Sequence, residues 1–308
     1  MPSRRRIDVQ PLIALALVQL FFATFPVLGK VVLREVTPLV VTVCRVVLGA
    51  LFLSIASRLL YPEEPRISAR DRWTLLGLSL LGVVANQTLY ILGLRDTTAS
   101  EAVLLINTIP IFTFVIGVLM GRERAGWRRI VGIPLALTGT LVVLGTRGFD
   151  LTDPEHRGNF IIVGNCLAYS FFLVLSRGIL RRRAALPVTA AVFRYAIVPV
   201  VLIALPDLAR FHPATLSQGA VLGLIAIVLF PTVIAYALNA WALQRTDAST
   251  TAVFVYAQPL VTWILAFTFL GERPGARFAL SAALVLSGVI LTTWPGKSVP
   301  AEPAEISP

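Results

Sequence analysis

The two halves of this chain align on each other through one ungapped shift of 149 residues. The shift pairs residues of quite different kinds, such as Arg45 with Arg194 and Pro110 with Pro259. Further pairs are Pro38 with Pro187, Ala99 with Ala248, Ser100 with Ser249, Glu123 with Glu272 and Gly139 with Gly288. Matches of such varied chemistry at a single offset are hard to reach by chance, so the sequence predicts two related halves.

Both halves are too apolar for a soluble domain. Of the 308 residues, 56% are hydrophobic and 14% are charged, whereas soluble domains average about 45–50% apolar and about 25% charged residues. A helix needs about 20 apolar residues to cross a bilayer, and such stretches recur along the chain. The first one, residues 11–33, is longer than the apolar part of a secretory signal, and no small-residue cleavage site follows it. We therefore expect an all-α integral membrane protein.

The apolar stretches predict ten transmembrane helices, five in each half. The first repeat is expected at 11–146 and the second at 159–294, joined by a polar connector at 147–158 and followed by a disordered, proline-rich tail at 295–308. The predicted spans are 11–33, 38–60, 73–94, 100–120, 130–146, 159–180, 188–206, 219–243, 250–270 and 278–294.

The basic residues of the loops predict how these helices are oriented. When the spans alternate in direction, most Lys and Arg residues fall on the side of the N-terminus, which places both termini in the cytoplasm. Because five is odd, the second repeat then enters the membrane from the side opposite to the first. The two halves are therefore predicted to be inverted repeats, an arrangement that gives inward-open and outward-open states from one fold.

The charge distribution also bears on partners and location. The net charge is +11, but the basic residues lie in short loops rather than along one polar face, so no nucleic-acid partner is expected. We expect a plasma-membrane protein, in a bacterial inner membrane, whose partners are the lipid bilayer and a small-molecule substrate. The motifs Gly117-x-x-x-Gly121 and Gly219-x-x-x-Gly223 are compatible with a homodimer, although such motifs are common in apolar sequence.

Three cationic residues lie inside the predicted spans, namely Lys30, Arg45 and Arg194. An arginine inside a bilayer is costly unless it is paired, hydrated or able to reach the interface. We interpret Arg45 and Arg194 as gating or structural charges that hold helices together, with binding of an anionic substrate group as the alternative. Both arginines are expected to be required for transport. Lys30 lies near the end of its span, where its long side chain is expected to reach the interface.

Amides and phenols recur at helical spacing inside the spans. Asn86 and Tyr90 are four residues apart, as are Asn165 and Tyr169, so each pair shares one helix face. Because such groups are costly in lipid, they are expected to line a substrate-binding cavity or to bond neighbouring helices together. The predicted substrate-binding residues are Asn86, Tyr90, Asn107, Asn165, Tyr169, Tyr236, Asn239 and Tyr256.

Two prolines and one carboxylate complete the set of candidate residues. Pro110 and Pro259 lie within matched spans, and since proline removes a backbone donor and frees a carbonyl, each is a candidate hinge or a plain packing kink. Glu101 is the only carboxylate in a predicted span and lies close to its outer end. It is therefore either the residue that couples transport to protons or an ordinary helix-end charge.

No motif of a known enzyme class appears in the sequence. There is no nucleotide-binding loop, hydrolase signature or metalloprotease motif. The two histidines and two cysteines are too scattered to predict a metal site. We therefore expect neither enzymatic activity nor a cofactor nor a bound metal.

Residues 110–142 and 259–291 resemble the end of an EamA domain of the drug/metabolite transporter superfamily. That pattern is a membrane helix with a proline, a Gly-Glu-Arg turn and a last helix rich in small residues. The turn is present as Gly271-Glu272-Arg273, and in the first half Arg122 interrupts it. The front of each half is also similar, with a proline followed seven residues later by an arginine.

This resemblance implies a ten-helix, inverted-repeat exporter that alternates access around a central cavity. Its substrates would be small metabolites such as amino acids or related compounds. A multidrug exporter and a non-transporting receptor or assembly scaffold are the alternatives.

Overall fold

The computed structural model describes residues 9–65, 67–121, 127–144, 152–243, 258–273 and 275–293. Within these ranges the chain forms helices and no strand, which confirms the all-α prediction. Seven helical segments are long and apolar enough to cross a membrane, and three shorter ones are also apolar. The seven are Val9–Val32, Pro38–Leu60, Ala69–Asp96, Ala99–Leu119, Pro154–Leu180, Ala185–Arg210 and Gln218–Asn239, and the shorter ones are Ile130–Val142, Val261–Leu270 and Ala276–Gly288.

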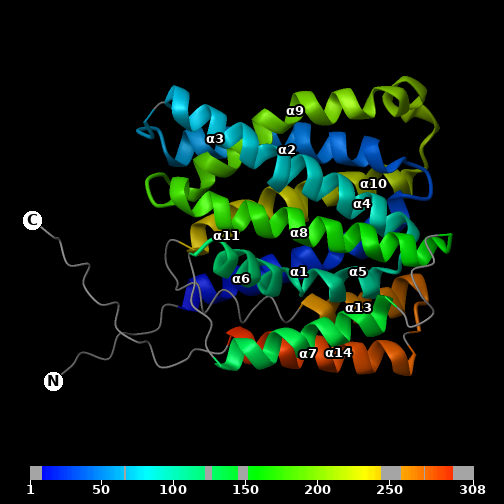
Figure 1. Ribbon diagram of the computed structural model, residues 1–308. Helices are drawn as coiled ribbons and strands as arrows, with labels where there is room; N and C mark the ends of the chain where they lie inside the picture. The colour runs from blue at the N-terminus through cyan, green and yellow to red at the C-terminus, as the bar shows by residue number, and fades with distance from the viewer. Residues whose placement is uncertain are drawn as a thin grey trace, which may run out of the picture.

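The helices lie side by side along one direction (Figure 1). In the first half they are α1 (Val9–Val32), α2 (Pro38–Leu60), α3 (Ala69–Ser79), the π-helix η1 (Leu80–Ala85), α4 (Asn86–Asp96), α5 (Ala99–Ile106), α6 (Ile109–Leu119) and α7 (Trp127–Leu144). The second half contains α8 (Pro154–Leu180), α9 (Ala185–Arg210), the short 3-10 helix η2 (Pro213–Thr215), α10 (Gln218–Val228), the π-helix η3 (Leu229–Ile234), α11 (Ala235–Leu243), α13 (Gln258–Leu270) and α14 (Ala276–Thr293).

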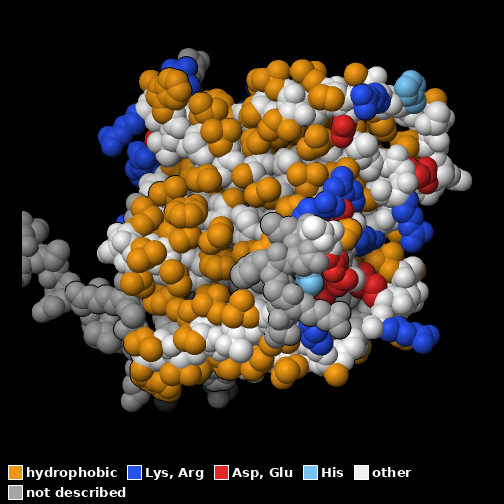
Figure 2. Space-filling model, turned by 45° about the vertical axis from the view of Figure 1, so that its right-hand side comes forward, with side chains coloured by type: hydrophobic (Ala, Val, Ile, Leu, Met, Phe, Trp, Pro, Cys, Tyr) orange, Lys and Arg blue, Asp and Glu red, His pale blue; other side chains and the backbone are white. Residues whose placement is uncertain are grey.

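The outer surface of this bundle matches a lipid environment. Large apolar side chains such as Leu119 and Trp73 are 81% and 76% exposed. In Figure 2 apolar side chains cover most of the left and middle of the visible face, basic side chains lie at its upper left edge, and acidic and basic side chains gather on its right. An apolar belt between charged ends is what a bilayer requires of a bundle that crosses it.

Helices of the two halves pack against each other throughout the bundle. The most extensive contacts join α7 to α14, α2 to α9 and α4 to α8. The contact between α7 and α14 depends on two glycines that the sequence shift pairs, Gly139 and Gly288. A Cβ atom at Gly139 would lie 2.7 Å from the backbone nitrogen of Val285, and one at Gly288 would lie 2.5 Å from that of Ala136. Only residues without a side chain allow the two backbones to come this close.

Local structure recurs at the offset of the sequence repeat. The π-helices η1 and η3 begin at Leu80 and Leu229, which are 149 residues apart. Gly121 and Gly271, which follow α6 and α13, have positive φ angles of 67° and 69°, a conformation that favours glycine. These two glycines are 150 residues apart, one more than the offset of 149, because Gly121 precedes Glu123 by two residues and Gly271 precedes Glu272 by one.

One predicted boundary differs in the structure. The predicted connector 147–158 is helical from Pro154, where α8 begins, because Asp153 accepts a hydrogen bond from the Glu155 backbone N–H at 2.9 Å and caps this helix. The predicted span 100–120 is found as the candidate span Ala99–Leu119, within which α5 and α6 meet at a break around Asn107, three residues before Pro110. Residues 244–257 lie outside the described ranges, so the predicted span 250–270 is described only from Gln258.

Candidate functional site

Arg45 lies in the interior of the bundle, on α2, with only 5% of its surface exposed. Its guanidinium carbon lies 3.8 Å from the centre of the Phe25 ring on α1. Its Nε donates a hydrogen bond to the hydroxyl oxygen of Thr232 in η3 at 3.1 Å. Thr232 in turn donates to the carbonyl of Ile227 at 2.9 Å, so its oxygen is held as an acceptor toward Arg45. Three helices from both halves therefore position this one cation.

The charge of Arg45 is not balanced by a carboxylate within the described residues. The phenol groups of Tyr90 and Tyr236 are the electrostatic neighbours of its guanidinium. A contact with an aromatic ring supplies about 2 kcal/mol when it is desolvated, whereas burying an ion costs several kcal/mol. A guanidinium has five N–H donors, and Thr232 accepts from one of them. The site is therefore suited to an anionic group brought by another molecule.

Aromatic rings surround the Arg45 guanidinium. Tyr90 stacks on Phe25 with 5.0 Å between ring centres. Tyr236 packs edge-on against Phe22 and Phe193, at 5.8 and 5.4 Å. These contacts join aromatic side chains of α1, α4, α9 and α11 next to Arg45.

Polar groups without a protein partner lie on α4 near these rings. The Tyr90 hydroxyl and both polar atoms of the Gln87 amide are buried and make no hydrogen bond within the described part of the chain. Each such group costs about 1–3 kcal/mol if it stays unsatisfied. Gln87 precedes Tyr90 by three residues, so both lie on one face of the helix. A buried cation, a buried phenol and a buried amide thus keep unused hydrogen-bonding capacity within the described part of the chain.

Of the predicted substrate-binding residues, Tyr90 and Tyr236 lie beside Arg45. Asn165 instead donates to the backbone carbonyl of Asn86 at 2.6 Å and so joins α8 to α4. Asn107 donates to the carbonyl of Val103 at 2.7 Å in the break between α5 and α6. Its own side-chain oxygen is buried without a partner in the described residues.

The remaining predicted residues are Tyr169, Asn239 and Tyr256. Tyr169 stacks on Phe172 with 5.5 Å between ring centres. Asn239 is half-buried on α11. Tyr256 lies outside the described residues.

Phe25, Gln87 and Thr232 were not among the substrate-binding residues predicted from the sequence. For Gln87 a signal exists, because the 149-residue shift pairs it with Tyr236. Thr232 and Phe25 give no such signal, since a threonine and a phenylalanine are ordinary residues in an apolar helix.

The two arginines paired by the repeat have different surroundings. Arg194 is exposed on α9, and its Nη1 donates to the hydroxyl of Ser54 at 3.1 Å. Arg45 is buried between helices of both halves. The sequence predicted equivalent roles for the two arginines, but their surroundings differ. Arg45 is buried against an aromatic ring, whereas Arg194 is exposed.

Glu101 takes part in a side-chain network between α5 and α8. Its carboxylate accepts hydrogen bonds from the amide of Asn159 at 2.7 Å and from the hydroxyl of Thr97 at 3.2 Å. Thr97 is also bonded to Asn159, and Glu155 is an acidic neighbour of Glu101. The carboxylate is half-buried and accepts from uncharged donors, and it forms no ion pair among the described residues.

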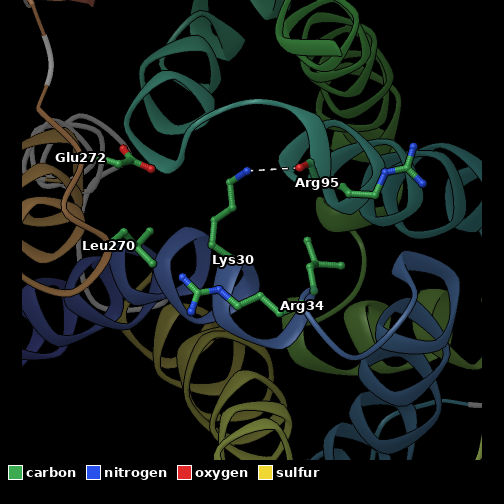
Figure 3. Close-up of a pocket in the computed structure, with 6 residues that line it drawn as sticks. Lys30, Arg34, Arg95, Leu270 and Glu272 are labelled. Carbon is green, nitrogen blue, oxygen red and sulfur yellow. Dashed lines mark hydrogen bonds between the residues drawn. The ribbon is translucent and has the colours of Figure 1, made fainter.

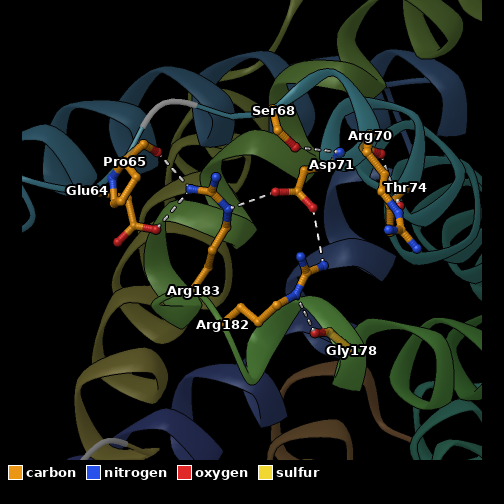
Figure 4. Close-up of polar contacts among 9 residues, drawn as sticks. All are labelled: Glu64, Pro65, Ser68, Arg70, Asp71, Thr74, Gly178, Arg182 and Arg183. Atoms are coloured by element: carbon orange, nitrogen blue, oxygen red, sulfur yellow. Dashed lines mark hydrogen bonds and ion pairs between the residues drawn. The ribbon is translucent and has the colours of Figure 1, made fainter.

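Polar contacts join the two halves at one end of the bundle, which we call the Asp71 end. Asp71, on the first turn of α3, accepts from Arg182 at 3.2 Å and from Arg183 at 3.3 Å (Figure 4). Arg183 also pairs with Glu64 at 3.3 Å and donates to the carbonyl of Pro65 at 2.7 Å. These contacts connect α3 and the chain before it with the turn between α8 and α9.

The opposite end of the bundle, which we call the Lys30 end, has a matching contact of different chemistry. Glu35, between α1 and α2, accepts from the backbone N–H of Ser217 at 2.8 Å and from its hydroxyl at 2.5 Å. These hydrogen bonds hold the pKa of Glu35 below its usual value. Ser217 caps α10 and Ser68 caps α3, 149 residues apart. The start of the third helix of each half is thus tied to the turn before the second helix of the other half.

A second contact at the Lys30 end joins Glu272, which follows α13, to the first turn of α5. The carboxylate of Glu272 accepts from the backbone N–H groups of Ala99 at 2.8 Å and Ser100 at 3.1 Å. It also accepts from the Ser100 hydroxyl at 2.6 Å. A carboxylate at a helix N-terminus satisfies donors that have no partner inside the helix.

We expect Asp71→Asn to loosen the Asp71 end without unfolding the bundle. The change removes the charge that faces Arg182 and Arg183, a loss of about 1–3 kcal/mol for charged hydrogen bonds. Hydrogen–deuterium exchange in the first turn of α3 should then become faster. Asp207→Asn is the matched control, since no ion pair of Asp207 occurs within the described residues. Equal protection of α3 in both variants would contradict a role for Asp71 in closing this end.

Comparisons with known proteins find relatives along nearly the whole chain. The model of the EamA-like transporter family matches twice, at residues 10–145 and 156–294. A protein of Archaeoglobus fulgidus named as an uncharacterized transporter is 28% identical over 283 residues, 91% of this chain and 96% of its own. A probable terminal-alkyne amino-acid exporter of Streptantibioticus cattleyicolor is 26% identical over 249 residues, 80% of this chain and 81% of its own.

The fold also has a counterpart among solved structures. One crystal structure superposes with a TM-score of 0.62, covering 92% of this chain and 95% of that chain at 20% sequence identity. At this identity the likeness concerns the fold alone.

Proposed function

The chain belongs to the EamA-like transporter family and is a multi-pass membrane transporter rather than an enzyme, and from this premise we propose that it exports small metabolites that carry a carboxylate. Amino acids and related compounds are the proposed substrate class. The observation that carries the proposal is the buried guanidinium of Arg45, which has no carboxylate partner within the described residues. The similarity to a probable amino-acid exporter supports both the substrate class and the direction of transport.

In this proposal the carboxylate of the substrate pairs with Arg45. A guanidinium can hold a carboxylate through two parallel hydrogen bonds, which fixes its orientation. The phenol of Tyr90 and the amide of Gln87 then bond the polar remainder of the substrate, and the rings of Phe25 and Tyr236 enclose it. Neutralising a buried cation and satisfying buried polar groups both favour binding.

Alternating access between two inverted five-helix repeats is the proposed mechanism. The 149-residue spacing of the π-helices and of the serine caps supports the repeat. The side-chain contacts at the two ends supply interactions that one state makes and the other breaks. We propose further that the protein lies in the plasma membrane with the Asp71 end toward the cytoplasm. A cysteine in place of Asp153, beyond the other end, should then react with an impermeant thiol reagent from outside the cell.

Transport into and out of liposomes tests this function. The purified protein is reconstituted, loaded with a mixture of unlabelled amino acids, and offered labelled amino acids one at a time from outside. A transporter exchanges its own substrates and accumulates the label, with saturation at high concentration, whereas a receptor or scaffold gives no exchange. If exchange occurred only with apolar cations, the multidrug alternative would replace the carboxylate proposal.

We expect Tyr90→Phe to weaken substrate binding without lowering stability. The hydroxyl has no protein partner within the described residues, so the protein loses no internal hydrogen bond. A substrate bonded to it loses about 0.5–1.5 kcal/mol, which raises the KM of exchange by about 2- to 12-fold. The KM and the melting temperature are measured on the same preparation. A lower melting temperature with an unchanged KM would place the hydroxyl outside the substrate site.

Glu101 is the proposed site of proton coupling. It is a half-buried carboxylate at the end of a membrane helix, with Glu155 as its acidic neighbour, and two such groups resist being ionised together. Glu101→Gln cannot exchange a proton but keeps a hydrogen-bonding side chain. We expect this variant to exchange substrate normally between the two sides of a liposome while losing its response to an imposed pH gradient. A response equal to that of the unchanged protein would exclude Glu101 as the coupling group.

A further inference from the structure

A pocket of about 350 Å³ opens at the Lys30 end of the bundle, at the ends of α1, α4 and α13. Its lining residues are Lys30, Leu33, Arg34, Arg95, Leu270 and Glu272. Figure 3 shows the amine of Lys30 directed into the middle of this pocket, with Glu272 on one side and Arg34 below. The Lys30 amine donates to the backbone carbonyl of Arg95 at 3.2 Å.

Two of the four charged groups in this pocket are already paired within the protein. Arg95 bonds to the carboxylate of Asp96 at 2.8 and 3.3 Å. Glu272 caps the start of α5 through both of its oxygens. Asp96 therefore balances the charge of Arg95, whereas Glu272 bonds only to uncharged donors and keeps one negative charge in the lining.

The other two charged groups are both cationic. The ammonium of Lys30 has three N–H donors, of which one bonds to an uncharged carbonyl. Arg34 is exposed and forms no ion pair within the described residues. These two cations outnumber the one negative charge of Glu272, so the lining has a net positive charge, and cations that converge on a cavity attract anions from solution.

We propose that this pocket is a second substrate site, an anion-binding vestibule that receives the carboxylate of a small organic solute. Leu33 and Leu270 form its apolar walls, which favours an organic anion over a hydrated inorganic one. The volume is near the lower end of the range for small-molecule sites, about 300–1000 Å³. The identity of the solute rests on the proposed function, but the preference for an anion does not.

The vestibule and the Arg45 site are both bordered by α1. Lys30 and Phe25 are both on α1, five residues apart, which is about 7.5 Å along a helix axis. The ring of Phe25 is in contact with the Arg45 guanidinium. In this proposal a carboxylate passes between two cationic positions, and the outer one holds it next to the opening.

The chain offers an unusually direct test, because Lys30 and Lys297 are its only lysines. In a Lys297→Arg background, Lys30 is the only lysine that an acylating reagent modifies. Sulfosuccinimidyl acetate and succinimidyl acetate transfer the same acetyl group but differ in charge. The protein in phosphatidylcholine nanodiscs is treated with each reagent, and acetylation of Lys30 is followed by mass spectrometry relative to the α-amino group.

If the pocket is an anion site, the anionic reagent should acetylate Lys30 about tenfold faster than the neutral one after this normalisation. Sodium acetate should protect Lys30 and choline chloride should not. Arg34→Gln should reduce the preference for the anionic reagent. Arg210→Gln is the matched control, since Arg210 is an exposed arginine on the last turn of α9 and is not among the lining residues.

Several results would contradict the proposal that this pocket is an anion-binding vestibule. These are equal rates with the two reagents, no reaction at Lys30 with either reagent, or a preference that persists in Arg34→Gln. Protection by phosphatidylglycerol in the nanodisc, with none by acetate, would instead assign the pocket to a lipid headgroup. Because acetylation needs no transport, loss of flux with an intact preference would count against the proposed function alone, and normal flux without a preference would count against the vestibule alone.

Discussion

Arg45→Ala is expected to lower substrate exchange in liposomes by about 100-fold while the protein keeps its normal abundance in the membrane. Losing one partner of a buried, hydrogen-bonded charge pair costs about 2–5 kcal/mol, and about 1.4 kcal/mol corresponds to a factor of ten. The partner lost here is the cation that the proposed substrate carboxylate meets. The measurement is the initial rate of exchange at a substrate concentration below KM, normalised to reconstituted protein.

The stability of this variant separates a substrate site from a structural role. Within the described residues the Arg45 side chain donates only to Thr232 and pairs with no carboxylate, so removing its charge relieves a desolvation cost. The melting temperature of the substrate-free protein should then stay unchanged or rise. A structural arginine would give the opposite result, with a lower melting temperature and loss of protein from the membrane.

Two further variants define what Arg45 contributes. Arg45→Lys keeps the charge but loses the planar fork that can hold a carboxylate through two bonds, so partial recovery of exchange is expected. Arg194→Ala is the control, because that arginine is exposed and donates only to Ser54 among the described residues. It should keep most of the exchange rate. Equal losses in Arg45→Ala and Arg194→Ala would show that the arginines act as an equivalent pair despite their different environments.

Gly288→Ala is expected to separate α7 from α14 and to lower the free energy of unfolding by about 1–3 kcal/mol, the usual cost of overpacking. The new methyl group would lie 2.5 Å from the backbone nitrogen of Ala136 and from the carbonyl oxygen of Gly132. Since both are backbone atoms, no flexible side chain can turn aside, and one helix has to shift. The melting temperature in detergent and the amount of folded protein in the membrane measure the effect.

Gly77→Ala is the matched control for this prediction. Gly77 is also in a helix, α3, but apart from its neighbours and the backbone of its own helix no atom lies within 4 Å of a Cβ placed there. Alanine favours a helix over glycine by about 1 kcal/mol, so this variant should be as stable as the unchanged protein or more so. A Gly288→Ala protein as stable as Gly77→Ala would mean that close contact between α7 and α14 is not needed.

Much of the fold can be predicted from the sequence because it depends on local chemistry. Apolar stretches of bilayer length predicted helices that cross a membrane, and seven candidate spans with three shorter apolar helices are found. Prolines, serines and glycines mark helix ends because each changes the backbone within a few residues. Ser68 and Ser217 cap helices, and Gly121 and Gly271 take the positive φ angles that end them.

Part of the candidate site could be predicted in the same way. Arg45, Tyr90 and Tyr236 were identified because a charge or a phenol in an apolar helix needs a polar neighbour. This reasoning names residues that are costly in lipid, and it does not say what satisfies them. It could not find Phe25 or Thr232, whose presence in a membrane helix is unremarkable until Arg45 lies against them.

The sequence by itself determined the helical membrane class, the residue matches at an offset of 149 and the residues whose polarity requires an explanation. Only the tertiary structure decided that Arg45 is enclosed while its repeat partner Arg194 is exposed, and that Asn165 bonds to a neighbouring helix while Tyr90 and Gln87 have no partner among the described residues. The physical reason is that polarity belongs to a residue, whereas burial and bonding depend on which helix faces meet. Helix packing brings together positions such as Arg45 and Thr232, which are far apart in the chain.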